Sequence, residues 1–167
     1  RDLLSELNSL LSELPNILAD EVPDGLTEKE NLEIRRHGTL PNFEFRAKDH
    51  VELGEALNGL DFNSAAKISG SRFVFLKSNL ARLERALTNF MLDHQVQKFG
   101  YTEISPPLMV NEKALFGTGQ LPKFSDQQFK TTDDYWLIPT SEVPLTNLVA
   151  DSIVDEAALP LRYTAYT

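Results

Sequence analysis

Apolar residues at the start of the chain follow the spacing of a helix. The leucines recur three and four residues apart, at Leu3, Leu4, Leu7, Leu10, Leu11 and Leu14. This alternation is typical of a coiled-coil seam, although a helix of this length is marginal in isolation. We therefore predict that residues 1–14 are the end of a longer helix, one leg of an antiparallel pair. An amphipathic helix that packs against the rest of the domain fits the pattern equally well.

Residues 15–48 have the composition of a linker. Prolines and glycines such as Pro23 and Gly38 are interspersed with many acidic side chains, and these residue types favour turns and loops. Regular patterning resumes at Asp49, which is placed to cap a short helix and is followed three positions later by an acidic residue. We predict that the globular domain occupies residues 49–167.

Helical and strand patterns are mixed within this domain. Residues 73–76 form a continuous apolar run, as a strand does, and residues 79–99 carry apolar side chains at helical spacing up to a C-terminal cap at Gly100. Residues 129–132 and 135–138 are placed to pair as a hairpin. The sequence therefore predicts an α+β fold.

Two segments of the domain contain prolines or glycines at notable positions. Pro106 and Pro107 interrupt the strand pattern of residues 101–110. Because proline cannot donate to a strand ladder, we expect this segment at an edge or interface. The glycine-rich residues 116–124 lack the spacing and the final Lys-Ser/Thr of a phosphate-binding P-loop, so they give little support for a nucleotide site.

The strongest candidate for chemistry is the Thr140-Ser141-Glu142 triplet, which follows the apolar residues 136–138. Alternate side chains of an extended chain share a face, so Thr140 and Glu142 can point together. A hydroxyl beside a carboxylate can accept charge-assisted hydrogen bonds from an ammonium group. In the alternative interpretation, Thr140 or Ser141 only caps a helix and Glu142 only complements its dipole.

The helix expected after this triplet carries apolar residues at helical spacing. We predict that its buried face consists of Leu145, Leu148, Val149 and Ile153.

Composition restricts the remaining possibilities. The 167 residues are 41% hydrophobic and include no cysteine, which excludes disulfides, thiolate metal sites and cysteine nucleophiles. No apolar run approaches the length of a membrane span, so we expect no membrane association and a cytoplasmic location. The net charge of -9 argues against this segment being a nucleic-acid-binding surface by itself.

Several of these segments together resemble seryl-tRNA synthetase, in the same order and over nearly the whole chain. They are residues 100–110, 117–124 (GTGQLPKF) and 138–147 (IPTSEVPLTN), with residues 49–55, 59–62 and 70–73 before them. The leucine-rich start is similar to the last turns of that family's tRNA-binding arm.

The resemblance implies a class II synthetase domain, an antiparallel sheet flanked by helices, that acts as a homodimer. It implies a serine–tRNA ligase that activates L-serine with ATP and Mg²⁺ to seryl-adenylate and then esterifies tRNA(Ser). Thr140, Ser141 and Glu142 match the family's serine-binding Thr-x-Glu, which holds the substrate's amino group. Pro107 matches the proline of the first class-defining motif at the dimer interface.

The chain also departs from the family pattern. The second and third class motifs, each with an arginine, have no counterpart before Thr167, and most of the helical arm is absent. We therefore expect a fragment that contains no catalytic residue or metal ligand, lacks most of the ATP site and is inactive alone, since adenylation requires cations near the α-phosphate. The alternatives are a prolyl-type class II synthetase, which also has a Pro-Thr-x-Glu, and a non-catalytic module that binds an amino acid or only dimerises.

Overall fold

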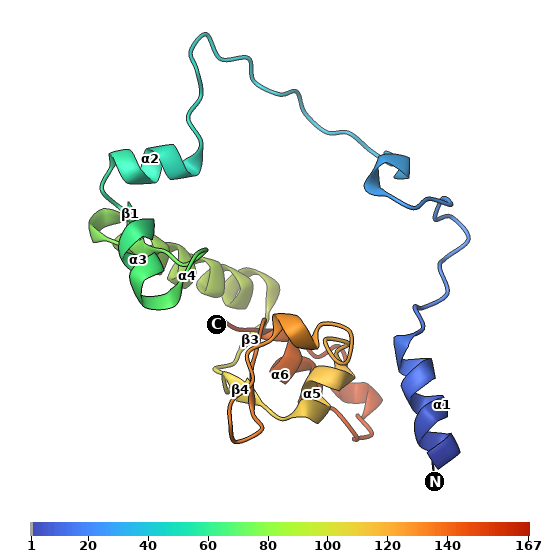
Figure 1. Cartoon of the computed structure of the whole chain (residues 1–167). Helices are drawn as coiled ribbons and strands as arrows, with labels where there is room; N and C mark the ends of the chain where they lie inside the picture. Colours follow the sequence, from blue (N-terminus) through green and yellow to red (C-terminus); the bar gives the residue numbers. More distant parts are fainter. Residues whose placement is uncertain (1) are drawn as a thin grey trace. The chain divides into compact units, whose positions relative to one another are not determined.

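The leucine-rich start of the chain forms a helix. The computed structural model describes residues 2–167, so the first residue of the predicted 1–14 segment lies outside the described residues. Helix α1 spans Asp2–Glu13 (Figure 1), and the leucines of its apolar stripe are exposed. Pairing of this helix with a second one stays a prediction.

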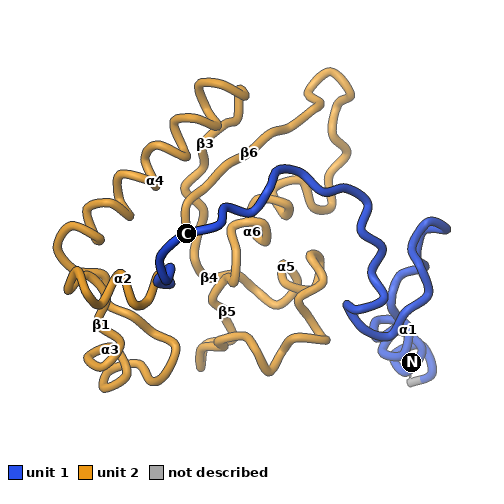
Figure 2. Tube along the Cα trace, turned by 90° about the horizontal axis from the view of Figure 1, so that it is seen from above, with its two compact units in different colours: residues 1–49 blue, residues 50–167 orange. Residues whose placement is uncertain are grey.

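The chain divides after Asp49 into two compact units (Figure 2). In the first unit, the residues after α1 are irregular except for a 3-10 helix, η1, at Glu28–Glu30. The Glu30 carboxylate accepts hydrogen bonds from the backbone N–H groups of Leu26 and Thr27, both at 2.7 Å. These two bonds lower the pKa of Glu30, and the bond from Thr27 has the larger effect. Local polar contacts therefore order a segment that has no buried side chains.

The second unit begins with two short helices and two short strands. Helix α2 spans His50–Ala56, strand β1 Leu60–Asp61, helix α3 Phe62–Ser69 and strand β2 Phe75–Leu76. The strands pair antiparallel, and the predicted strand at 73–76 is confirmed over its second half. Gly54 of α2 is buried against β1. A Cβ at this position would lie 2.3 Å from the Leu60 side chain, so only glycine lets the helix approach β1 this closely.

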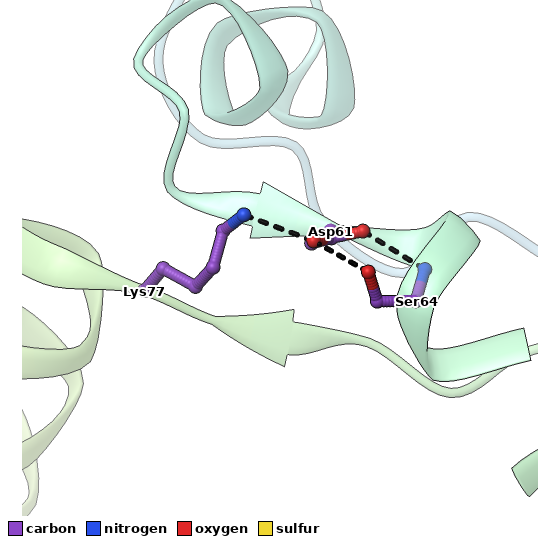
Figure 3. A network of polar contacts seen from close by, with 3 residues as sticks. All are labelled: Asp61, Ser64 and Lys77. Carbon is purple, nitrogen blue, oxygen red and sulfur yellow. Dashed lines mark hydrogen bonds and ion pairs between the residues drawn. The ribbon is translucent and has the colours of Figure 1, made fainter. Parts of the chain in front are cut away.

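Asp61 joins this region to the helix that follows (Figure 3). Its carboxylate caps α3 by accepting hydrogen bonds from the Ser64 backbone N–H and the Ser64 hydroxyl, each at 2.9 Å. It also accepts a hydrogen bond from Lys77 Nζ at 2.9 Å. The Ser64 N–H, followed by Lys77, lowers the pKa of Asp61 from 3.8 to about 2. One carboxylate thus links β1, α3 and the residue before the next helix.

The long helix α4 spans Ser78–Phe99 and ends at Gly100, whose φ of +68° is left-handed. The predicted helix and its glycine cap are confirmed. Much of its apolar surface stays uncovered in the described residues, because Leu83, Leu87 and Phe90 are all exposed.

Four further strands form two separate pairs. Strand β3, Thr102–Glu103, lies parallel to β6, Tyr163–Thr164. Strand β4, Met109–Val110, pairs antiparallel with β5, Trp136–Leu137. The predicted hairpin is also confirmed, because Leu137 N–H donates to the Phe129 carbonyl at 2.9 Å and Lys130 bridges to Trp136. Two of the three strand pairs are therefore antiparallel, as the class II fold implies, and the third is parallel.

A small core joins β4 and β5 to two short helices, α5 at Glu112–Gly117 and α6 at Glu142–Asn147. It consists of Val110, Leu115, Leu121, Trp136 and Val143, with Ala114 and Ile138 packed against it. Leu115 and Val143 are 0% exposed. Two 3-10 helices complete the chain, η2 at Ser125–Gln127 and η3 at Glu156–Ala158.

The buried face predicted for the helix after the Thr-x-Glu triplet is wrong. Helix α6 ends at Asn147 and buries Val143 and Pro144, whereas Leu148 and Ile153 are exposed. The reason is that the core lies against the first turn of α6, and the chain leaves the helix before the later apolar residues could form a face.

None of the helices within residues 2–167 has the length and apolar character needed to cross a membrane.

Replacing Asp61 with Asn should destabilise the fold, because the neutral amide weakens the contacts to Ser64 and Lys77. The pKa of Asp61 is depressed in the folded state, so its stabilisation is present above about pH 4 and is lost as the pH falls toward 2. We expect D61N to unfold at a lower urea concentration than the wild type at pH 7, with the difference shrinking in acid. Asp126→Asn, at an exposed acid, is the matched control. Equal midpoints for D61N and the wild type at pH 7 would contradict this.

Candidate functional site

Thr140, Ser141 and Glu142 lie where strand β5 gives way to helix α6, as the sequence predicts. All three residues line one hollow of about 510 Å³. Its other walls come from α6 and from the segment around β6, namely Leu145, Thr146, Val149, Leu161, Tyr163, Thr164 and Ala165. The structure therefore brings the triplet together and adds a second wall from a distant part of the chain.

The local hydrogen bonds distinguish the roles of the two hydroxyl residues. Thr140 Oγ1 accepts a hydrogen bond from the Glu142 backbone N–H at 3.3 Å, which is long for such a bond. Ser141 occupies the N-cap position but makes no side-chain capping hydrogen bond. The capping interpretation thus accounts weakly for Thr140 and does not account for the Ser141 hydroxyl.

Glu142 is exposed in the first turn of α6. Among residues 2–167, no group donates a hydrogen bond or ion pair to its carboxylate. The hollow is lined by four hydroxyl-bearing residues besides tyrosine, and no lysine or arginine of the described chain lines it. An unpaired carboxylate among hydroxyl groups favours a cationic hydrogen-bond donor such as an ammonium group.

Helix α6 is held in place by Asn147, a residue that the sequence analysis did not select. Its side-chain amide Nδ2 donates to the Ala114 carbonyl at 3.0 Å and to the Val143 carbonyl at 2.8 Å. The first bond joins α6 to α5, and the second ties the end of α6 to its own first turn. Asn147 is half-buried, and its helical spacing from Val143 is the only sequence signal for this role.

The segment around β6 is a strand, as its sequence pattern predicts, but its place in the site was not predicted. Residues 161–166 have the alternating pattern of a strand, but the pattern does not reveal a strand's partner. The backbone N–H groups of Thr102 and Ile104 donate to the carbonyls of Arg162 and Thr164, both at 2.9 Å. These bonds to β3 bring Tyr163 and Thr164 to the hollow.

Pro107 lies apart from the triplet, in the exposed segment between β3 and β4. It lines a second hollow, of about 480 Å³, together with apolar residues that include Pro144 and Leu148. Leu145 lines both hollows. A role for Pro107 in a dimer interface stays a prediction.

Within residues 2–167, no group of three or more histidine or acidic side chains is arranged to hold a metal ion.

No protein-family model matches the chain. Curated relatives do match it. The serine–tRNA ligases of Brucella canis and Brucella suis are each 59% identical to it over 167 residues, which is 100% of this chain and 39% of the relative.

Solved structures give the same result. The crystal structure of seryl-tRNA synthetase from Pyrococcus horikoshii complexed with ATP matches with a TM-score of 0.87 and 34% identity, over 98% of this chain and 41% of that chain. The cytoplasmic serine–tRNA ligase from Naegleria fowleri in complex with AMP matches with a TM-score of 0.83 and 26% identity, over 98% and 39%.

The fold of the chain matches that of class II seryl-tRNA synthetases. Within that class, the chain is a homologue of the serine–tRNA ligases, and it spans about 39% of the length of the curated relatives it matches. These relatives support the seryl interpretation over the prolyl alternative.

Replacing Asn147 with Ala should destabilise the fold by about 1–2 kcal/mol, because the carbonyl groups of Ala114 and of buried Val143 each lose a hydrogen bond from its side chain. We expect urea unfolding to give a lower free energy of unfolding for N147A than for Asn63→Ala, whose exposed side chain lies on α3. Equal effects of the two substitutions would show that the Asn147 bonds contribute nothing to stability.

Proposed function

We propose that residues 1–167 are the amine-binding part of a serine–tRNA ligase. The complete enzyme would activate L-serine with ATP to seryl-adenylate and then transfer the seryl group to tRNA(Ser). The observation that carries this proposal is the unpaired Glu142 carboxylate beside the Thr140 hydroxyl, in a hollow lined by neither lysine nor arginine of the described residues. The homology to serine–tRNA ligases supports serine as the amino acid.

The proposed role of the triplet is to bind and orient the substrate. In the first reaction, a carboxylate oxygen of serine attacks the α-phosphorus of ATP, an acyl–phosphate bond forms, and pyrophosphate leaves. Glu142 and Thr140 would hold the ammonium group at the opposite side of the α-carbon. Fixing that group restricts the direction in which the serine carboxylate can approach, which is the usual gain from orientation.

The same residues cannot carry out the chemical step alone. Negative charge increases on the α-phosphate as the bond forms, and stabilising it requires cations. The hollow receives no lysine or arginine from the described residues. The structure neighbours complexed with ATP and AMP support ATP as the second substrate. Mg²⁺, which the family resemblance implies, would supply further positive charge at the phosphates.

The remaining partners follow from the family. Contact with tRNA(Ser) would be made through a helical arm of which α1 is the end, since the net charge of -9 does not favour a polyanion elsewhere on the chain. Two such chains would form a homodimer, with Pro107 and the apolar hollow beside it at the interface. We propose a cytoplasmic location, as for the Naegleria fowleri relative.

A complete ligase that includes residues 1–167 should catalyse ATP–pyrophosphate exchange that depends on serine and not on proline. A polypeptide of residues 1–167 alone should show no exchange, because the cations that stabilise the α-phosphate are not among these residues. The proposed function would be overturned if the complete protein catalysed exchange that depends on proline, or if it catalysed no exchange. Serine-dependent exchange by residues 1–167 would contradict the division of roles.

Replacing Glu142 with Ala in the complete enzyme should weaken use of serine, because the ammonium loses a charge-assisted contact. We expect kcat/KM for serine to fall by a factor that corresponds to roughly 1.5–3 kcal/mol. The control is Glu156→Ala, which removes an exposed acid from the first turn of η3. Unchanged KM and kcat for E142A would mean that Glu142 interacts only with the helix dipole.

A further inference from the structure

Tyr166 makes a contact that the proposed function does not use. Its hydroxyl donates a hydrogen bond of 2.5 Å to Glu84 Oε1, across 82 positions of the chain. A bond this short is typical of a hydroxyl that donates to a carboxylate. The hydrogen bond to Glu84 raises the pKa of Tyr166.

The position of Tyr166 makes this contact relevant to the site. The three residues before it, Tyr163, Thr164 and Ala165, line the hollow of the Thr-x-Glu triplet. Tyr166 itself lines a different hollow of about 500 Å³ on the surface of α4, together with Glu84 and Thr88. Ala165, which lines the hollow, is therefore adjacent in sequence to Tyr166, which bonds to α4.

Helix α4 is a long element that packs beside the strand pair β3–β6. It is the longest helix of the described residues, with 22 residues, and it contacts both β3 and β6. Figure 2 shows β6 alongside β3, with α4 next to them. Glu84 lies in the second turn of α4, and the Thr88 hydroxyl one turn later donates to the Glu84 carbonyl at 3.0 Å. The strand pair β3–β6 has only two residues on each side, so the Glu84–Tyr166 bond is a further attachment of this short strand to α4.

We infer that the Glu84–Tyr166 hydrogen bond is a positioning contact for the serine site: it holds the β6 wall of the hollow against α4, so that the wall faces Thr140 and Glu142. This inference rests on the proposed function, because it assumes that serine occupies the hollow. Neither residue touches the substrate, and their effect is transmitted through residues 163–165.

The test uses the complete ligase and serine-dependent pyrophosphate exchange. Tyr166→Phe removes the donor and keeps the ring, and we expect KM for serine to rise by about three- to tenfold with a smaller change in kcat. Glu84→Ala should have the same effect. Glu84→Gln, which keeps an acceptor oxygen, should restore part of the affinity. Tyr101→Phe is the matched control, because no described residue bonds to the Tyr101 hydroxyl.

The double variant Glu84→Ala/Tyr166→Phe distinguishes positioning from a general loss of stability. Because the two residues act through one bond, the double variant should be no worse than either single one. A loss of folded enzyme would instead lower kcat per total protein and leave KM for serine unchanged. An unchanged KM for serine in Y166F, or additive effects in the double variant, would overturn the inference. The proposed function would still stand if the wild-type enzyme catalyses serine-dependent exchange. No serine-dependent exchange by the wild type would overturn both.

Discussion

The site depends on a few apolar side chains that lie immediately beside it in the sequence. Trp136 precedes Thr140 by four residues and Val143 directly follows Glu142, and both belong to the same buried cluster. The Thr-x-Glu triplet is therefore a short, partly exposed segment with buried side chains close to both of its ends. Close-packed interiors tolerate little change in volume, so a change of volume in this cluster affects the position of the triplet as well as the stability of the fold.

Charge is the physical basis of the amine binding that we propose for the triplet. The hollow contains one carboxylate, several hydroxyl groups and no lysine or arginine of the described residues, so its local potential favours a positive group. An amino acid carries a carboxylate as well, and that end needs a cation that these residues do not supply. Binding and activation thus have different electrostatic requirements, and the lining of the hollow suits the first of them.

Much of this arrangement could be predicted from the sequence, because it depends on local patterns. The spacing of apolar residues and Gly100 are enough to define α4, and the prolines at 106 and 107 mark the interruption between β3 and β4. The hydroxyl and carboxylate of the triplet could be selected because their chemistry is visible in the residue types. These features need no knowledge of what lies far away in the chain.

The parts that could not be predicted depend on contacts between distant residues. The parallel pairing of β3 with β6 and the bonds from Asn147 to α5 join segments that carry no local sign of their partners. The wrong buried face after α6 has a related cause. Helical spacing was present at Leu148 and Ile153, but the core had already been filled by Val143 and by side chains from β4, β5 and α5.

The parallel pairing also has a consequence for the order of folding. The cluster around Trp136 joins residues 110 to 143, so its loops are short, and it can form as soon as these residues meet. Strand β3 must instead wait for a partner that lies some sixty positions further along the chain. Contacts over longer separations cost more loop-closure entropy and form more slowly. On this difference in loop length we expect the triplet to be positioned before the opposite wall of the hollow, so the hollow is completed by one of the later contacts to form.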